Sequence, residues 1–433
     1  MAAAPLPDPV LSEGPDTVTV TQDLIDAPDL GAVDLADPDL YADGDFFSVW
    51  QYLQRHDPVH YNRRPDGSGF WAVTKHREAM QVYTDKESFT SERGMRVGGG
   101  ISSRASGSKM LIVTDGSRHR QLRALMAPPL NPRAVRQLES NMRSVVGDLL
   151  DRAREHDEFD FVDTVAARLP LYVTCELLGV PLEDWDAVID WTRTAFGSVA
   201  GDDGQGAVTE AEQSEAHAAI FLYATDLLAA RRREPRDDIV SALAHGTIDG
   251  RPLTEEEIMV NINGLLTGGN ETTRHASSGA VHAFAAFPWE FQTLVAQNGI
   301  PAGAIEEVLR WTAPSLHVMR TALREVTVGD VTVRPGQEVA VWNPAVNRDG
   351  DEFPDPYRFD TTRTPNRHVT LGYGQHVCIG GTLARTELRV LLEEVLARVA
   401  SVELRGPVRR LRSNLMWGLD RLPVHFEWKA TRV

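Results

Sequence analysis

The spacing of apolar residues along the chain predicts a mainly helical protein. Apolar side chains recur every three or four positions over long segments, which gives an α-helix one apolar face. The segments with this spacing are residues 134–154, 212–232, 254–286, 302–311 and 382–399. Strand-like stretches are few and short. The clearest are residues 69–73 and the pair 326–328 and 331–333, which Gly329 and Asp330 join as a tight hairpin.

The chain is predicted to form one large domain. No internal repeat or low-complexity linker divides its 433 residues, so we expect a single domain over residues 38–433. Residues 1–37 are rich in Ala, Pro and Asp and are predicted to be a mobile lead-in. Residues 343–356 have the sequence of a long irregular connection, and such loops commonly carry function. The predicted fold class is mainly α with small β-sheets.

Charge and composition exclude several classes of function. The formal net charge of -18 leaves no excess of Lys and Arg to displace counterions from phosphates, which argues against general nucleic-acid binding. No stretch approaches the roughly 18 to 20 consecutive apolar residues that cross a bilayer. The N-terminus lacks the basic start and apolar centre of a secretory signal. We therefore expect a cytoplasmic protein that does not use a membrane.

Two cysteines, Cys175 and Cys378, are too few for a disulfide framework or for a zinc site built mainly from cysteine. Cys175 lies in the apolar run 169–178 and is predicted to pack in the core. Cys378 ends the sequence Leu-Gly-Tyr-Gly-Gln-His-Val-Cys and precedes a predicted helix. A thiolate facing a helix N-terminus is stabilised by the helix dipole and by free N–H groups. An inert buried thiol is the alternative.

The segment around Cys378 resembles the cysteine-ligand loop of cytochromes P450. That loop has the pattern Phe-Gly-x-Gly-x-His-x-Cys-x-Gly, and residues 371–380 match every fixed position except the first, Leu371. The resemblance implies that Cys378 ligates the iron of haem b and that His376 contacts a haem propionate. The aromatic residue usual at the first position would pack beside the thiolate, so the effect of Leu371 on the redox properties is left open.

A long helix is predicted to start at Thr254, since Thr254 and Glu257 have the spacing of a capping box. Three glycines, Gly264, Gly268 and Gly269, lie in its middle, and each costs about 1 kcal/mol relative to alanine. A locally widened helix that passes over a ligand would explain them. Close packing of helices at small residues, with ordinary threonine back-bonding, is the alternative.

Residues 268–273 of this predicted helix resemble the P450 I-helix motif, small-Gly-x-acid-Thr-Thr. In that family the acid and the first threonine organise the waters that deliver protons to bound oxygen. The resemblance therefore gives catalytic roles to Glu271 and Thr272. A carboxylate and a hydroxyl suit this task because together they accept, donate and relay protons.

Glu307 and Arg310 lie one turn apart on the predicted helix 302–311 and resemble the Glu-x-x-Arg pair of the family. The resemblance implies a third partner from the loop before the cysteine segment, and Arg358 is the predicted one. We expect this triad to support the haem pocket structurally rather than to take part in catalysis. A solvated pair on a helix surface is the alternative.

His119 and Arg123 lie four residues apart and therefore on one helix face. The equivalent helix of the family binds a haem propionate with these two residues. Arg320 resembles a further propionate-binding arginine that follows the Glu-x-x-Arg helix. Charge-assisted hydrogen bonds to carboxylates are a natural use of these side chains, and a basic surface face is the alternative.

The resemblance implies a haem-thiolate monooxygenase, which inserts oxygen from O2 into an organic substrate or couples it oxidatively. The demanding chemistry belongs to the cofactor, haem b. No Gly-x-Gly-x-x-Gly pattern follows a predicted strand, so no flavin or nicotinamide domain is indicated. The expected electron donors are a ferredoxin and its reductase, which would dock near Arg118 and Arg120 on the thiolate side of the haem.

Three other functions remain as alternatives. A peroxide-driven P450 usually lacks the acid–threonine pair, which Glu271 and Thr272 retain. A non-catalytic P450-like helper is associated with loss of the cysteine or the oxygen motif, and Cys378 and His376 are both present. A haem-based sensor would carry an output domain, and the sequence indicates none.

The sequence says less about the substrate. Alanine- and arginine-rich composition resembles actinobacterial P450s that tailor natural products, which implies a secondary-metabolite intermediate: a polyketide, a peptide or carrier-bound amino acid, or a terpenoid. Residues 93–109 are rich in Gly and Ser and contain no acid, which indicates either a lid over the substrate or an ordinary solvated loop. Family topology implies pocket walls at Asn263, Leu266, Thr267, Gly268, His317, Val318, Met319, Met416 and Trp417.

Overall fold

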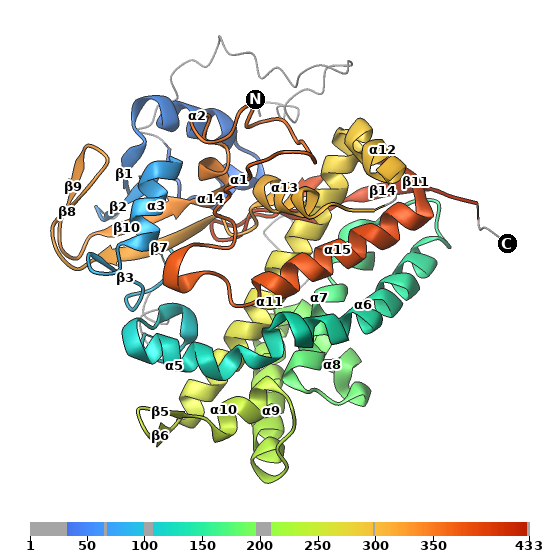
Figure 1. The fold of residues 1–433 in the computed structure, drawn as a ribbon, viewed down its shortest axis with the longest axis horizontal. Helices are drawn as coiled ribbons and strands as arrows, with labels where there is room; N and C mark the ends of the chain where they lie inside the picture. Colours follow the sequence, from blue (N-terminus) through green and yellow to red (C-terminus); the bar gives the residue numbers. More distant parts are fainter. Residues whose placement is uncertain (1–32, 65–66, 99–106, 196–208, 298, 431–433) are drawn as a thin grey trace.

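A computed structural model describes residues 33–64, 67–98, 107–195, 209–297 and 299–430 (Figure 1). Most of the predicted lead-in, residues 1–37, lies outside these ranges, and so does the centre of the predicted lid, residues 99–106. Residues 33–37 are described and pack on the fold. Leu35 is buried, and its N–H donates to Asn62 Oδ1 at 2.9 Å. The domain boundary at residue 38 stays a prediction.

Helices make up most of the fold. The α-helices are α1 (Pro38–Ala42), α2 (Phe46–His56), α3 (His76–Thr84), α5 (Gly116–Met126), α6 (Pro132–Ala153), α7 (Leu169–Leu178), α8 (Trp185–Ala195), α9 (Glu210–Arg233), α10 (Ile239–His245), α11 (Glu255–Ala286), α12 (Pro288–Gln297), α13 (Ala302–Thr312), α14 (Asn343–Val346) and α15 (Gly381–Arg398). Shorter helical turns are η1 (Leu111–Val113), η2 (Pro128–Leu130), the π-helical η3 (Val162–Ala166), η4 (Leu182–Asp184) and η5 (Gly374–His376).

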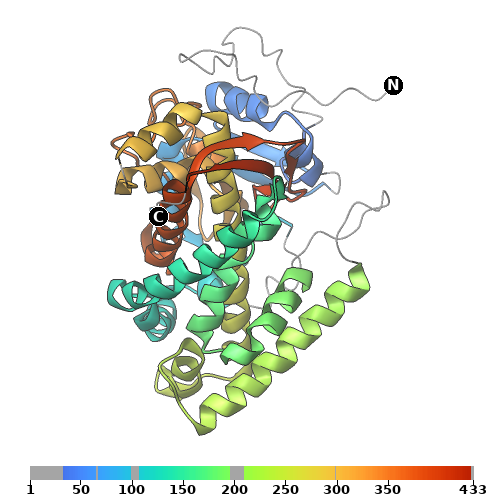
Figure 2. The same ribbon diagram turned by 90° about the vertical axis from the view of Figure 1, so that its right-hand side faces the viewer.

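Helix α11 is the central element and runs through the middle of the molecule (Figure 1). It begins as predicted: the Thr254 hydroxyl accepts from Glu257 N, and the Glu257 carboxylate accepts from Thr254 N. It then packs against α7, α13 and α15. Helices α9 and α10 lie at the end of the molecule away from α1 and α2, as Figure 2 shows. The five predicted helices correspond to α6, α9, α11, α13 and α15.

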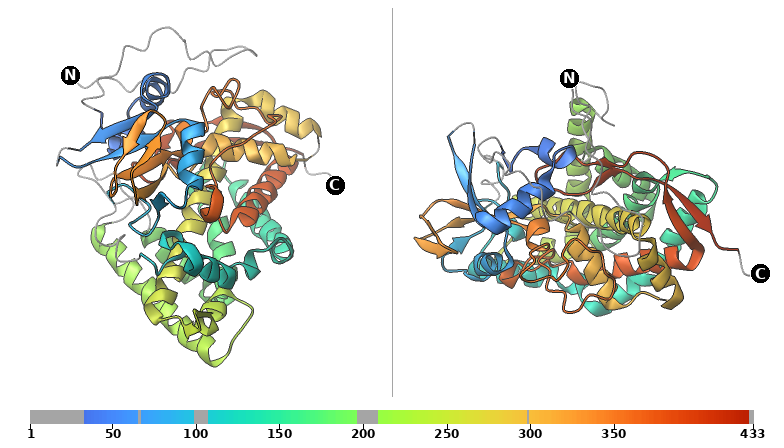
Figure 3. Two further views of the ribbon diagram at one scale, coloured as in Figure 1. Left: turned by 60° about the vertical axis from the view of Figure 1, so that its left-hand side comes forward. Right: turned by 90° about the horizontal axis from the view of Figure 1, so that it is seen from above.

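The strands are mostly short. They are β1 (Val59–Arg63), β2 (Gly69–Val73), β3 (Phe89–Thr90), β4 (Phe159–Asp160), β5 (Thr247–Ile248), β6 (Arg251–Pro252), β7 (His317–Ala322), β8 (Val326–Val328), β9 (Val331–Val333), β10 (Glu338–Trp342), β11 (Val399–Leu404), β12 (Arg409–Arg410), β13 (Leu419–Arg421) and β14 (Pro423–Trp428). The main sheet has the order β1-β2-β10-β7-β3 and lies to one side of the helices (Figure 3). The predicted hairpin is β8–β9, and Gly329 takes the positive φ of 57° that its turn needs.

The core has a helical part and one part on each face of the main sheet. Apolar faces of α6, α7, α11 and α15 form the first. Aromatic side chains including Trp50, Trp342 and Trp417 form the second, against α2. Cys175 is completely buried in the helical part, which confirms its predicted place in the core. Among the described residues, no helix is both long enough and apolar enough to cross a bilayer.

Candidate active site

The Cys378 loop is shaped by its glycines. Gly372 and Gly374 take φ values of 68° and 69°, which side chains rarely adopt. A Cβ on Gly374 would also lie 2.9 Å from the Tyr83 carbonyl oxygen, so this position has no room for another residue. The Cys378 N–H donates to the Leu371 carbonyl at 2.8 Å and closes the loop. The sequence of small residues thus fixes the backbone that presents the thiol.

The thiol of Cys378 lies at the N-terminus of α15 and is accessible. Arg123 of α5 reaches the same loop, where its Nη1 donates to the Val377 carbonyl at 2.8 Å. Burial raises the pKa of the Cys378 thiol, although the Gly380 N–H and the charges of Arg123 and Arg385 favour the thiolate. The thiol therefore keeps some exposed surface, but the surrounding residues exclude most of the water around it. A metal ion bound to a thiol in such surroundings favours loss of the thiol proton.

Two different features of their surroundings explain why glycine occupies positions in the middle of α11. A Cβ on Gly264 would lie 2.3 Å from Met110 Cε, and one on Gly269 would lie 3.2 Å from Thr174 Oγ1, so these two glycines allow close packing. A Cβ on Gly268 would meet nothing within 4 Å, although Gly268 lies in the middle of the central helix. The predicted local widening is wrong, because α11 is α-helical throughout. The open space beside Gly268 remains, as a ligand over the helix requires.

Glu271 and Thr272 flank this space with different partners. Thr272 Oγ1 donates to the Gly268 carbonyl at 2.8 Å, which leaves its lone pairs available. Glu271 Oε2 lies 3.4 Å from Arg274 Nη1 and 3.6 Å from His275 Nε2. Burial raises the pKa of Glu271, but the nearby His275 and the charge of Arg274 outweigh it and lower the pKa overall. Sequence reasoning missed Arg274 and His275, although their spacing after Glu271 places them on its helix face.

His119, His376 and Arg320 form a basic group beside the cysteine loop. The rings of His119 and His376 have centroids 4.5 Å apart, and His119 Nδ1 is buried without a hydrogen-bond partner. Burial lowers the pKa of His119 to about 4, helped by the charges of His376 and Arg123. Arg320 is buried on β7, and its Nη1 donates only to the Met319 carbonyl. In the part of the chain that the structure describes, no carboxylate forms an ion pair with Arg320; burial lowers its pKa, and the charge of Asp115 opposes this shift.

The buried ion cluster behind the site has a different third member from the predicted one. Glu307 and Arg310 are completely buried. Arg310 donates two hydrogen bonds to the Glu307 carboxylate, from Nε at 2.7 Å and from Nη2 at 2.8 Å. The second arginine on Glu307 is Arg363, whose Nε lies 3.2 Å from Oε2. Arg358 contributes only its carbonyl, which accepts from Arg310 and Arg363 at 3.0 Å, and its side chain is exposed. The prediction of Arg358 as the ion-pair partner is therefore wrong.

Several predicted pocket walls belong to the core instead. In β7, alternate residues face opposite sides of the sheet, and His317 and Met319 lie on the core side, His317 stacked on Trp342 with ring centroids 4.9 Å apart. Trp417 packs in the same aromatic cluster. These three predictions are wrong, because strand alternation and aromatic packing turn the side chains inward.

Leu266 is also part of the core and not a pocket wall. The predicted wall residues that keep exposed surface are Asn263, Thr267, Gly268, Val318 and Met416. Val318 lies on the same face of β7 as Arg320, two residues away, which is the side opposite His317. The accessible wall therefore combines one arc of α11 with one face of β7.

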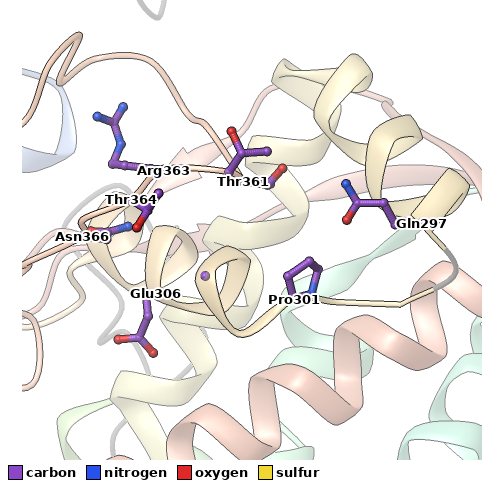
Figure 4. Close-up of a pocket in the computed structure, with 9 residues that line it drawn as sticks. Gln297, Pro301, Glu306, Thr361, Arg363, Thr364 and Asn366 are labelled. Carbon is purple, nitrogen blue, oxygen red and sulfur yellow. The ribbon is translucent and has the colours of Figure 1, made fainter.

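Two hollows open on the surface near these elements. A hollow of about 250 Å³ is lined by residues of the cysteine loop, including Tyr373 and Cys378, and by Arg385. A second of about 380 Å³ lies among Gln297, Pro301 and the threonines that precede Asn366. Figure 4 shows the Glu306 carboxylate pointing away from Gln297 and Thr361, toward its partner Arg385 at 2.6 Å. The second hollow thus offers no free charge and none of the predicted site residues.

Comparison with known proteins identifies the family. The family described as Cytochrome P450 matches residues 302–419. Cytochrome P450 NovI of Streptomyces niveus is 35% identical over 409 residues, which cover 93% of this chain and 98% of the relative. The structure of P450 OxyD, involved in the biosynthesis of vancomycin-type antibiotics, has a TM-score of 0.84 and 40% identity and covers 92% of this chain and 100% of OxyD. P450BioI, solved with an acyl carrier protein carrying hexadec-9Z-enoic acid, has a TM-score of 0.77 and 26% identity, covering 88% and 98%.

The chain belongs to the cytochrome P450 family and has the cytochrome P450 fold. It is accordingly a monooxygenase, and the cofactor of the family is haem b. The residues present fit this cofactor. An accessible thiol, an unpartnered His119 nitrogen and a buried Arg320 without an anionic partner are the groups that an iron and two propionates would complete.

Proposed function

We propose that Cys378 is the axial ligand of the haem iron and that the enzyme modifies a secondary-metabolite intermediate. The observation that carries the proposal is the accessible thiol at the N-terminus of α15, held by a loop in which a Cβ on Gly374 has no room. When bound, haem supplies the activation of O2 and the oxidation of the substrate. The protein supplies the ligand, the protons and the shape of the pocket.

Glu271 and Thr272 are the residues that handle protons. Glu271 Oε2 is stabilised as a carboxylate by Arg274 and His275, so it is ready to accept a proton and pass it on. Thr272 Oγ1 gives its own proton to the Gly268 carbonyl and therefore presents lone pairs to a water in the open space. The two residues are consecutive on α11, so their side chains do not face each other and water would have to connect them in a relay.

His119, Arg320 and His376 would bind the propionates, with Arg123 beside them. Arg320 is buried without an ion-pair partner among the described residues, so an anion there removes a large electrostatic cost. Arg123 holds the Val377 carbonyl and thus joins α5 to the cysteine loop. The buried cluster of Glu307, Arg310 and Arg363 supports the loop that precedes Cys378 and has no part in the reaction.

Electrons come from a ferredoxin and its reductase, as is general for bacterial P450s. Arg120 is exposed on α5, the helix that touches the cysteine loop, and is available to a negatively charged partner. Arg118 is less available than predicted, because its guanidinium binds Glu257 and the Ser108 carbonyl. A cytoplasmic location would give the enzyme access to both partners.

The proposed substrate class is a natural-product intermediate, with a carrier-bound acyl or aminoacyl group as one form of it. OxyD supports this class by 40% identity over 92% of the chain and by its involvement in the biosynthesis of vancomycin-type antibiotics, and P450BioI supports it by its complex with a loaded carrier protein. The wall formed by Asn263, Thr267 and Val318 offers both polar and apolar contact to such a group.

The test is a titration of purified holoenzyme with three probes: an aminoacyl group on a carrier protein, the same amino acid free, and a terpene alcohol. Binding next to the iron is followed as a spin-state change in the absorbance spectrum. We expect the spin-state change with the carrier-bound probe or another natural-product probe. We also expect that product forms only when ferredoxin, its reductase and O2 are present. Product formation with peroxide alone and not with ferredoxin would contradict the proposal.

A further inference from the structure

Asp115 gathers hydrogen bonds from two segments that are distant in sequence. Its Oδ2 accepts from Thr90 Oγ1 at 2.6 Å and from the Ser91 N–H at 2.9 Å. Its Oδ1 accepts from His376 Nε2 at 2.7 Å and from Gln375 Nε2 at 3.3 Å. One carboxylate thus joins the end of β3, the start of α5 and the loop that carries Cys378.

Helix capping does not explain this arrangement. Asp115 is the N-cap residue of α5, a position that aspartate favours because its oxygen usually accepts from the N–H groups of the first turn. Here the side chain makes no capping hydrogen bond. Asp45, in the same position before α2, does accept from the Ser48 N–H at 3.1 Å. Asp115 therefore gives up the local interaction in favour of contacts across the fold.

Two of the joined segments carry proposed propionate ligands, and the third, β3, pairs with the strand that carries Arg320. His119 lies one turn into α5, and His376 is a direct partner of Asp115. Strand β3 pairs with β7 so that Thr90 faces Thr321, the neighbour of Arg320. The position of Asp115 thus sets the relative position of all three basic side chains.

We propose that Asp115 is a positioning residue for haem retention, acting through His376. The proposal rests on the proposed function of the site. Because Asp115 occupies Nε2, only Nδ1 of His376 is left to bind a second anion, which fixes the ring orientation toward a propionate. Carboxylates that orient a histidine in this way commonly tune the group that the histidine binds. Asp115 itself touches neither the iron nor the substrate.

The experiment measures haem loss from purified holoenzyme to an excess of apomyoglobin, followed by absorbance. We expect D115N to lose haem about tenfold faster than the wild type, the lower end of the usual effect of such outer residues. The control is D45A, which removes a real helix cap far from the site and should leave the rate unchanged. T90V should change the rate less than twofold, because the bond from His376 to Oδ1 remains.

A double-mutant cycle with H376Q separates positioning from general structural support. If Asp115 acts through His376, adding D115N to H376Q should accelerate haem loss by less than twofold. Wild-type retention in D115N, or a full tenfold effect in both backgrounds, would overturn the proposal. If D115N does not fold, D115E takes its place in the cycle with the same criterion of non-additivity.

The carbon monoxide difference spectrum distinguishes a failure of this inference from a failure of the proposed function. A wild-type enzyme without the band of thiolate-ligated haem would refute the proposed function itself. A wild-type enzyme with that band, together with D115N that holds haem as firmly, would refute only the role of Asp115.

Discussion

Two groups of polar and charged side chains around the segment that leads to Cys378 differ in how completely they are paired. In the Glu307 cluster, Arg310 and Arg363 bind the carboxylate, and carbonyls accept their other N–H groups. In the group of His119, Arg320 and Cys378, the thiol is accessible, and among the described residues no partner binds His119 Nδ1 and no carboxylate forms an ion pair with Arg320. A closed cluster holds the fold together, whereas an open one is completed by a ligand.

This contrast is useful because each group contains a buried arginine. Burying a charge is costly unless it is paired and hydrogen-bonded, so each unpaired buried group needs an explanation. For the Glu307 cluster the protein itself provides every partner. For the open group the missing partners are two carboxylates and a metal ion, which together describe haem.

Breaking the closed cluster should have the largest effect on stability. E307A removes the one carboxylate that neutralises Arg310 and Arg363, so we expect a loss of about 3–5 kcal/mol in the free energy of unfolding. Urea unfolding followed by circular dichroism measures it. R358A is the matched control, because that side chain is exposed and should change stability by no more than about 0.5 kcal/mol. A loss for R358A as large as for E307A would show that the predicted, rather than the observed, arginine is the partner.

Changing Glu271 tests the side of the site where protons are handled. E271Q keeps the size of the side chain but removes its ability to take up a proton at Oε2, so product formation should fall about a hundredfold. The rate of product formation is measured with whichever probe gives the spin-state change. The fraction of the supplied electrons that is used to form product is measured in the same assay. E255Q, at the exposed start of α11, is the control and should behave as the wild type. Full activity of E271Q would remove Glu271 from the mechanism.

Acid should weaken the fold through a histidine that lies in neither group. Burial lowers the pKa of His317 to about 3, and its Nε2 accepts from the Val97 N–H at 2.8 Å. The folded state therefore excludes a proton that the unfolded state binds below its pKa of 6.5. The contribution of His317 to stability is complete above pH 6.5 and is lost as the pH falls toward 3.

H317Q keeps an acceptor for Val97 and does not titrate in this range, so its stability should depend less on pH. Between pH 6 and pH 4 we expect the slope to fall by up to about 1.4 kcal/mol per pH unit. Unfolding free energies at several pH values provide the measurement, with H217Q, an exposed histidine on α9, as the control. Parallel curves for H317Q and the wild type would show that His317 takes up its proton in the folded state.

The sequence predicts the helices well because their apolar periodicity is long and their caps are local. Thr254 and Glu257 cap α11 as expected. Strands β7 and β10 were not predicted, since they are almost completely buried and lack a regular alternation of polar and apolar residues. For the same reason, His317 and Met319 are predicted from the sequence to lie in the pocket. In the structure they lie on one face of β7, and Val318 and Arg320 lie on the opposite face.

The ion pairs were harder to predict than the motifs. Arg358 and Arg363 lie in a connection without periodicity, so nothing local distinguishes the buried one from the exposed one. Asp115 lies four residues before His119, but its bonds to Thr90 and His376 depend on how β3 and the cysteine loop fold back on α5. Such contacts join residues 25 and 261 positions apart, and spacing within a motif carries no information about them.

The most direct test of the account is the carbon monoxide difference spectrum of reduced enzyme, recorded for the wild type, C378S and C175S. Cys378 as the iron ligand predicts the band of thiolate-ligated haem in the wild type and in C175S and its complete absence in C378S. A wild type that binds haem without this band, or a C378S variant that keeps it, would contradict the central claim.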